Sequence, residues 1–125
     1  LCDEIAGLEC IPQCTRRKLV ARGYTPPQVG RTMDFVVCKV GEVSGHVDIE
    51  ANYFAVSGSK PDVITGYIDR QARLAEDGWR FILITDGPGW HEMEALLQDA
   101  VEHLDYIMNL DQVRRGMLRA AVQQS

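Results

Sequence analysis

The run WRFILIT at residues 79–85 is the feature that most restricts how this chain can fold. It is almost unbroken in its apolar character over the length of one strand. Such a run is typical of a strand that is buried on both faces and runs parallel to a neighbour. A sheet built around it needs a layer of helices on each side.

The segments around this strand supply the other elements of an α/β fold. Turn residues and apolar spacing divide the chain into a regular order of helices and strands. We expect a helix at 15–23, strands at 31–40 and 46–54, a helix from Ser59 to Gly78, the strand at 79–85, a helix at about 90–104, a short strand at 106–110 and a final helix containing Arg114, Arg115 and Arg119. This order predicts a mixed β-sheet flanked by helices, in which a hairpin feeds a right-handed crossover.

Length and composition fit one soluble domain. The chain has 125 residues, of which 46% are apolar and 25% charged, and we expect a single domain over residues 1–125. The chain begins with Leu1 instead of methionine, so we also expect a further segment upstream. No apolar run approaches the roughly 18 residues of a membrane span, and we expect a cytoplasmic protein. The four cysteines form no CxxC pair, which favours free thiols over a zinc site.

Net charge alone does not identify a partner. The chain carries −5, which argues against nucleic acid, because phosphate binding depends on lysine and arginine. However, residues 1–32 hold five basic and three acidic side chains. Arg16, Arg17 and Lys18 cluster there, and they are candidates for DNA contacts. An ordinary solvated helix face would give the same pattern.

The strand at 46–54 carries the most informative alternation. His46, Asp48, Glu50 and Asn52 fall on one face, and apolar residues fall on the other. An amphipathic strand with one side in water would show the same pattern. The glycine-bounded turn at 41–45 indicates that this strand forms a hairpin with the strand before it.

The simplest register of this hairpin brings acidic residues together. If Val40 joins His46 directly across the turn, Asp34 lies opposite Asn52 and diagonal to Glu50. Opposite Cβ atoms lie ~5 Å apart and diagonal ones ~7–8 Å apart, on the same face. Asp34, Glu50 and Asn52 would then converge, and a shift of one residue would separate them.

Two carboxylates on neighbouring strands repel each other unless a cation neutralises them. Mg²⁺ takes hard oxygen ligands, keeps several waters and often binds through one or two carboxylates and a substrate phosphate. The pattern of Asp34 followed by Glu50 and Asn52 therefore suits hydrolysis of a phosphodiester bond. Taken alone the pattern is weak, because many strands contain such acids.

Several longer motifs occur in order around these acids. They are Asp34-Phe35-Val36, Ile49-Glu50-Ala51-Asn52-Tyr53-Phe54, Gly58-Ser59-Lys60, Thr85-Asp86-Gly87-Pro88-Gly89-Trp90 and Asn109-Leu110. In this arrangement the chain resembles the DpnII-type family of type II restriction endonucleases, within the PD-(D/E)xK nuclease superfamily. The resemblance covers roughly residues 11–113 and implies a restriction-endonuclease-like core.

The resemblance implies a role for each matching residue. Asp34 and Glu50 would be catalytic carboxylates that bind Mg²⁺. Asn52 would occupy the catalytic position where the superfamily usually has lysine. Either Lys60, as a further catalytic residue, would supply the missing positive charge from the helix start, or the ion and solvent would suffice. Ser57 and Ser59 are candidates for DNA contacts near a helix N-terminus, although an N-cap explains Ser59 equally well.

The function implied is Mg²⁺-dependent cleavage of double-stranded DNA at a short, GATC-like site. A homodimer is expected, because a palindromic site presents two equivalent halves. Two alternatives remain open at this point. One is a repair or junction nuclease that recognises DNA shape. The other is a nuclease-like module that has lost catalysis and serves in DNA binding or assembly.

Overall fold

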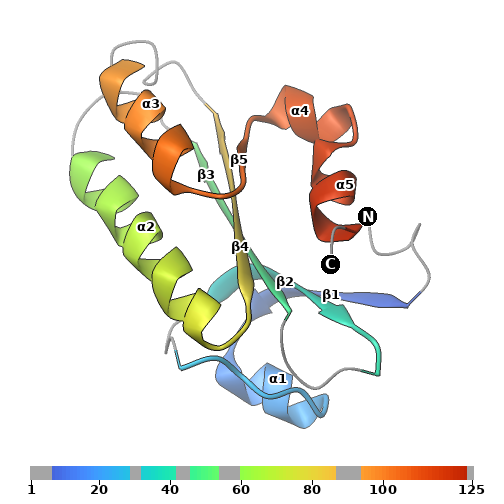
Figure 1. Ribbon diagram of the computed structural model, residues 1–125. Helices are drawn as coiled ribbons and strands as arrows, with labels where there is room; N and C mark the ends of the chain where they lie inside the picture. Colours follow the sequence, from blue (N-terminus) through green and yellow to red (C-terminus); the bar gives the residue numbers. More distant parts are fainter. Residues whose placement is uncertain (1–6, 29–31, 42–45, 54–59, 87–93, 124–125) are drawn as a thin grey trace.

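The computed structural model contains one five-stranded sheet with helices on both faces (Figure 1). It describes residues 7–28, 32–41, 46–53, 60–86 and 94–123. The elements are β1 (Leu8–Cys14), α1 (Arg16–Ala21), β2 (Met33–Lys39), β3 (Val47–Tyr53), α2 (Lys60–Glu76), β4 (Arg80–Asp86), α3 (Glu94–His103), β5 (Ile107–Met108), α4 (Leu110–Arg114) and α5 (Met117–Gln123).

The strands lie in the order β1-β2-β3-β4-β5. β2 pairs antiparallel with both of its neighbours, β1 and β3, whereas the pairs β3–β4 and β4–β5 are parallel. The predicted α/β class with a mixed, helix-flanked sheet is therefore confirmed. The link from β3 through α2 to the parallel strand β4 is the crossover that the sequence predicted.

β4 is buried on both faces, as its apolar run indicated. Phe81, Ile82 and Leu83 are almost fully inaccessible to solvent. Alternate residues of the strand enter two separate apolar clusters, because successive side chains point to opposite faces of a sheet. Phe81 and Leu83 belong to one cluster, and Ile82 belongs to the other.

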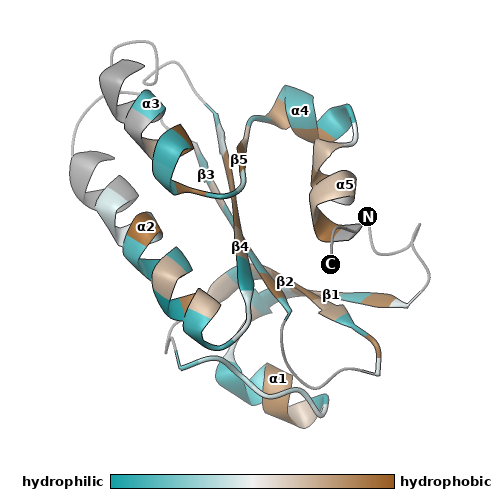
Figure 2. Ribbon diagram, in the orientation of Figure 1, coloured by the Kyte–Doolittle hydropathy of each residue, from teal (hydrophilic) through white to brown (hydrophobic). Residues whose placement is uncertain are grey.

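The helices cover these two clusters from opposite sides. α2 and α3 lie over one face and α4 and α5 over the other, as Figure 1 shows. Leu74 of α2 and Leu19 of α1 enter the first cluster, and Val122 of α5 enters the second. Figure 2 shows hydrophobic residues along the middle of β4, between the two helical layers. No described helix is long and apolar enough to cross a membrane.

The edge strand β1 was not predicted from the sequence. Its pairing with β2 runs from Leu8↔Lys39 to Cys14↔Met33. Pro12 obscures the strand pattern, since proline has no N–H for a ladder and occurs mainly in edge strands. The last predicted helix is also wrong in one respect. It is two short helices, α4 and α5, separated at Gly116, whose φ is +95°.

Cys14, Cys38 and His46 are buried. Cys14 and Cys38 are free and buried, as expected, but Cys10 is disulfide-bonded, so the prediction of free thiols is wrong for that residue. His46 is 1% exposed. Its ring makes edge contacts with Tyr24 and Trp79, at centroid distances of 4.9 and 5.5 Å.

Candidate active site

β2 and β3 pair in a register that differs from the expected one by two residues. Phe35 lies opposite Ile49, and Val36 lies opposite Asp48 instead of Glu50. The expected pairing of Asp34 with Asn52 is therefore wrong, because each described pair is displaced by two positions from the pairing that the simplest hairpin assumes. A shift of two preserves the alternation along a strand. Continuing the observed register brings Asp34 opposite Glu50.

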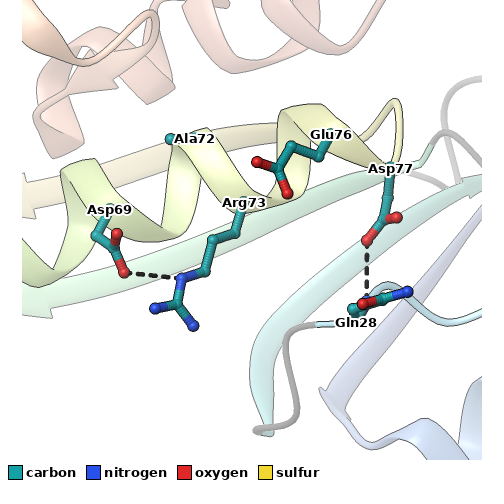
Figure 3. Close-up of a pocket in the computed structure, with 6 residues that line it drawn as sticks. All are labelled: Gln28, Asp69, Ala72, Arg73, Glu76 and Asp77. Atoms are coloured by element: carbon teal, nitrogen blue, oxygen red, sulfur yellow. Dashed lines mark hydrogen bonds and ion pairs between the residues drawn. The ribbon is translucent and has the colours of Figure 1, made fainter.

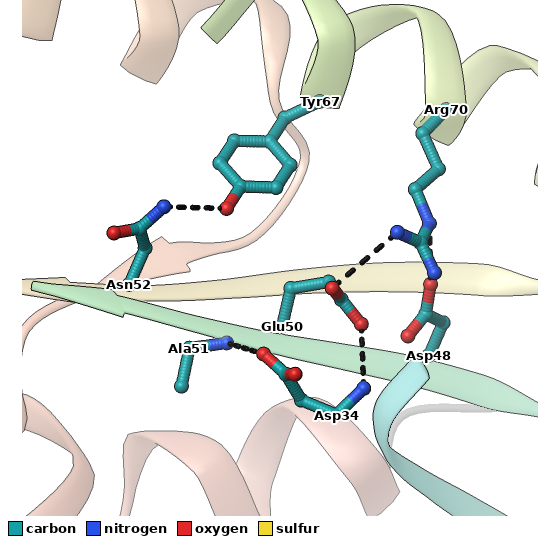
Figure 4. Close-up of polar contacts among 7 residues, drawn as sticks. All are labelled: Asp34, Asp48, Glu50, Ala51, Asn52, Tyr67 and Arg70. Atoms are coloured by element: carbon teal, nitrogen blue, oxygen red, sulfur yellow. Dashed lines mark hydrogen bonds and ion pairs between the residues drawn. The ribbon is translucent and has the colours of Figure 1, made fainter. Parts of the chain in front are cut away.

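The described backbone pairing of β2 with β3 ends at Phe35 and Ile49. Next to this pair, the side chains of Asp34 and Glu50 connect the two strands. The backbone N–H of Asp34 donates to Oε2 of Glu50 at 2.9 Å, and the backbone N–H of Ala51 donates to Oδ2 of Asp34 at 3.0 Å. Figure 4 shows each carboxylate reaching the backbone of the other strand. The structure therefore brings Asp34 and Glu50 together, where two strands part.

Asn52 is directed to α2 and not to the acids. Its Nδ2 donates to the hydroxyl of Tyr67 at 2.8 Å (Figure 4). The ring of Tyr67 packs against Phe81, with centroids 5.8 Å apart. Tyr67 therefore packs in the core through its ring and binds the polar row of β3 (His46, Asp48, Glu50 and Asn52) through its hydroxyl.

A buried arginine from α2 connects two acids of β3. Nε of Arg70 lies 2.9 Å from Oδ2 of Asp48, and its terminal nitrogen NH1 donates to Oε1 of Glu50 at 3.3 Å (Figure 4). Arg70 is 4% exposed, Asp48 0% and Glu50 4%. The sequence prediction did not include Arg70. Its signal was a charged residue in the apolar stripe of α2, between Tyr67 and Leu74.

The electrostatics of this cluster are dominated by burial. Burial raises the pKa of the Asp48 carboxyl well above its usual range, and the neighbouring Glu50 raises it further, while Arg70 lowers it. Three carboxyl groups, those of Asp34, Asp48 and Glu50, and one guanidinium lie in this cluster, and the raised pKa favours the neutral form of Asp48. A cation beside Asp34 and Glu50 would relieve the repulsion between their carboxylates.

The donors present suit such a cation. Carboxylate oxygens are the ligands that Mg²⁺ prefers, and the ion usually keeps several of its waters. A carboxylate has about four lone-pair positions, so the hydrogen bonds described leave positions open on Asp34 and Glu50. Within the described residues, no group of three His, Cys, Asp or Glu side chains is placed to hold a metal ion. Asp34 and Glu50 therefore offer two carboxylates as possible ligands, and not three.

The other predicted site residues differ in how far the structure describes them. Lys60 is the first residue of α2, and its side chain lies outside the described part. Ser57 and Ser59 also lie outside the described residues. Their proposed contacts with DNA and the proposed charge of Lys60 therefore remain predictions.

The cationic residues of α1 lie near the Asp34 end of β2. Lys18 donates from Nζ to the carbonyls of Pro12 and Gln13, at 3.2 and 3.1 Å. Gln13 lies between Pro12, which pairs with Phe35, and Cys14, which pairs with Met33. Lys18 is therefore hydrogen-bonded to the part of β1 that lies beside Asp34.

The two neighbouring arginines of α1 differ in their contacts. Arg16 donates to the carbonyl of Pro27 at 2.6 Å, which ties α1 to the segment that follows it. Arg17 is exposed. Both cations lie on the same short helix as Lys18 and remain accessible.

Comparisons with known proteins identify the family of this chain. A profile of the DpnII restriction endonuclease family matches residues 19–120. The type II restriction enzyme LlaDCHI of Lactococcus lactis subsp. cremoris is 32% identical over 56% of the chain, and the match covers 24% of that enzyme. The type II restriction enzyme MboI of Moraxella bovis is 36% identical over 50% of the chain and 23% of the enzyme.

A third relative matches almost the whole chain. The type II restriction enzyme MjaIII of Methanocaldococcus jannaschii is 27% identical over 99% of the chain, which corresponds to 44% of that enzyme. The chain thus covers less than half the length of each of these relatives. No solved structure matches it. The family match over residues 19–120 shows that this chain belongs to the DpnII restriction endonuclease family.

Proposed function

We propose that this chain is the catalytic core of a Mg²⁺-dependent endonuclease that cleaves double-stranded DNA at a short, GATC-like site. The observation that carries the proposal is the contact of Asp34 with Glu50 across two strands. The restriction enzymes named above support the type of activity. The resemblance described in the sequence analysis is the only support for a GATC-like target.

In this proposal Asp34 and Glu50 hold the metal ion. When bound, Mg²⁺ would lower the pKa of a coordinated water and balance charge on the phosphate. The two acids would fix its place beside the scissile phosphodiester bond. Lys60, at the start of α2, would supply positive charge toward the phosphate, because Asn52 cannot carry it.

The charges around the site favour an approach of DNA from the side of α1. Arg16, Arg17 and Lys18 would contact phosphates there. A hollow of about 530 Å³ along α2 is a poor alternative, as Figure 3 shows. Its lining contains three acids and one arginine and would repel phosphate: Asp69, Glu76, Asp77 and Arg73, with Gln28 and Ala72.

A homodimer acting in the cytoplasm completes the proposal. A palindromic site has two equivalent halves, and two copies related by a two-fold axis would each cut one strand. Sedimentation with and without a palindromic oligonucleotide would measure this directly. A complex containing a single copy that still cuts both strands would contradict the dimer.

Plasmid cleavage in the presence of Mg²⁺ tests the proposed activity. We expect discrete fragments from the unchanged protein. Asp34→Asn and Glu50→Gln should each lower the rate at least about 100-fold, because even the partners of metal ligands can contribute that much. Asp69→Asn is the matched control, since this acid lies on the outer surface of α2 in an exposed ion pair. Unchanged rates in both site variants would overturn the assignment.

A second candidate function is a nuclease-like module without catalysis. The observation that favours it is the hydrogen bond of Asn52 to Tyr67, which leaves the polar row of β3 without a cation at that position. This candidate predicts DNA binding with neither cleavage nor Mg²⁺ binding by the unchanged protein. Nicking that depends on DNA shape and not on sequence would instead indicate a repair nuclease.

A further inference from the structure

The contacts of Arg70 determine how Glu50 is presented. One guanidinium nitrogen binds Oε1 of Glu50 at 3.3 Å, while Oε2 of the same carboxylate accepts the N–H of Asp34 at 2.9 Å. Glu50 is therefore held from two directions, by α2 on one side and by β2 on the other. Without the guanidinium, Glu50 would keep the Asp34 amide and the neighbouring Asp48 carboxyl as hydrogen-bond partners.

Stability alone does not account for this arrangement. Nε and the second terminal nitrogen of Arg70, and both carboxylate oxygens of Asp48, are buried without an aligned hydrogen bond to any described residue. The pair with Asp48 is close, at 2.9 Å, but poorly aligned. Replacing such a buried ion pair by apolar residues is often neutral or stabilising. A costly pair beside Glu50 calls for an explanation other than packing.

We infer that Arg70 is a positioning residue of the nuclease centre. Its guanidinium contacts both Asp48 and Glu50, and it holds the Glu50 carboxylate against the start of β2, next to Asp34. The inference rests on the proposed function only for the use of this geometry in metal binding. Asp48 contributes by holding Nε of Arg70, so that the guanidinium does not turn fully toward Glu50. Glu50 then keeps one oxygen on the side of Asp34.

Amide hydrogen exchange tests the positioning directly and needs no activity. The Asp34 N–H is bonded to the Glu50 carboxylate and so reports where that carboxylate lies. In Arg70→Met we expect its exchange to accelerate at least about tenfold, as for the loss of a hydrogen bond to a charged group. The Trp79 N–H, bonded to the Leu74 carbonyl at 2.9 Å, serves as a reference for overall stability.

Arg73→Met is the matched control. This arginine lies on the same helix, and its exposed side chain pairs with Asp69 at 3.0 Å. It should leave exchange at both amides unchanged. If Arg70→Met also leaves Asp34 as protected as in the unchanged protein, the positioning role is overturned.

A double variant separates positioning from folding. Asp48→Leu combined with Arg70→Met replaces the ion pair by apolar side chains, so the protein should remain folded. We still expect faster exchange at Asp34 and a Kd for Mg²⁺ raised about 10-fold or more, the loss typical for partners of metal ligands. A folded double variant with unchanged exchange and unchanged Kd would overturn the inference.

Titration of the unchanged protein with Mg²⁺ distinguishes the two proposals. If that protein binds no Mg²⁺ and cuts no DNA, the proposed function fails, while the exchange data still decide whether Arg70 positions Glu50. If it binds Mg²⁺ and cuts DNA, but Arg70→Met changes neither the affinity for Mg²⁺ nor the exchange at Asp34, the proposed function stands and the inference about Arg70 fails. Arg70→Lys adds a further check, because lysine keeps the charge but cannot bridge two acids in the same way.

Discussion

Asn52 donates its side-chain amide to the hydroxyl of Tyr67 at 2.8 Å, and this bond connects strand β3 to helix α2. This bond links the polar row of β3 to the helix that also supplies Arg70. The site is therefore a product of two strands and the crossover helix above them. A substitution in α2 should therefore alter the site even when its acidic residues are unchanged.

The first prediction concerns this bond. Tyr67→Phe removes the hydroxyl but keeps the ring that packs on Phe81. We expect the free energy of unfolding to fall by about 1 kcal/mol, as for one hydrogen bond within a protein. Urea unfolding followed by tryptophan fluorescence measures it. A loss of stability in Tyr67→Leu with none in Tyr67→Phe would show that the ring, and not the hydroxyl, stabilises the protein.

The second prediction concerns the stabilising effect of Mg²⁺. If Asp34 and Glu50 bind the ion, a concentration about 100 times its Kd should stabilise the folded protein by about 2.7 kcal/mol. Asp34→Asn should abolish this gain, whereas Asp69→Asn on the outer surface of α2 should keep it. Thermal unfolding with and without Mg²⁺ makes the comparison. An equal gain in all three proteins would place the ion elsewhere.

The third prediction is a dependence of stability on pH. The hydrogen bond from the Tyr24 hydroxyl at 2.8 Å is the main cause that holds the pKa of Glu9 below its usual 4.5, and Arg22 lowers it further. A lowered pKa stabilises the folded state above 4.5, and this contribution disappears as the pH falls through the folded-state pKa. Tyr24→Phe should therefore be less stable than the unchanged protein at pH 7.

In acid that difference should shrink, because Glu9 is then protonated in both the folded and the unfolded state. Urea unfolding at a series of pH values gives the two curves. Phenylalanine keeps the ring contact with His46, so packing is little changed. Curves that stay parallel down to low pH would show that the hydroxyl does not act through Glu9.

The fourth prediction concerns the attachment of α5 to the sheet. The guanidinium of Arg80 donates to the carbonyls of Ala121 and Val122, at 2.6 and 2.9 Å. Arg80→Met should destabilise the protein by about 1.5–3 kcal/mol, as for hydrogen bonds made by a charged group. Arg115→Met, which breaks only an exposed pair with Asp111, should cost under about 0.5 kcal/mol. Equal effects would contradict an anchoring role.

Local pattern was enough to predict much of the architecture. The apolar run of β4 indicated burial between two helical layers, and that prediction is confirmed by Phe81, Ile82 and Leu83. The alternation along β3 put Asp48 and Glu50 on one face, and both contact Arg70. Such periodicity depends only on neighbouring residues, so it can be read before the fold is known.

The hairpin register could not be obtained in the same way. The sequence indicated a turn between β2 and β3 but not which residue lies at its centre, and a change of one position at the centre moves every pair by two. Asp34 was therefore expected opposite Asn52, whereas the observed register brings it opposite Glu50. β1 was missed because Pro12 and its polar neighbours lack a clear strand pattern.

The sequence by itself determined the α/β class, the buried strand and the pair of acids Asp34 and Glu50, because each follows from local periodicity or from ordered motifs. Only the tertiary structure decided which side chains surround those acids. Arg70 reaches Glu50 from 20 positions along the chain, and Tyr67 reaches Asn52 from 15. Contacts of that kind depend on how a helix packs over a sheet, which no local pattern records.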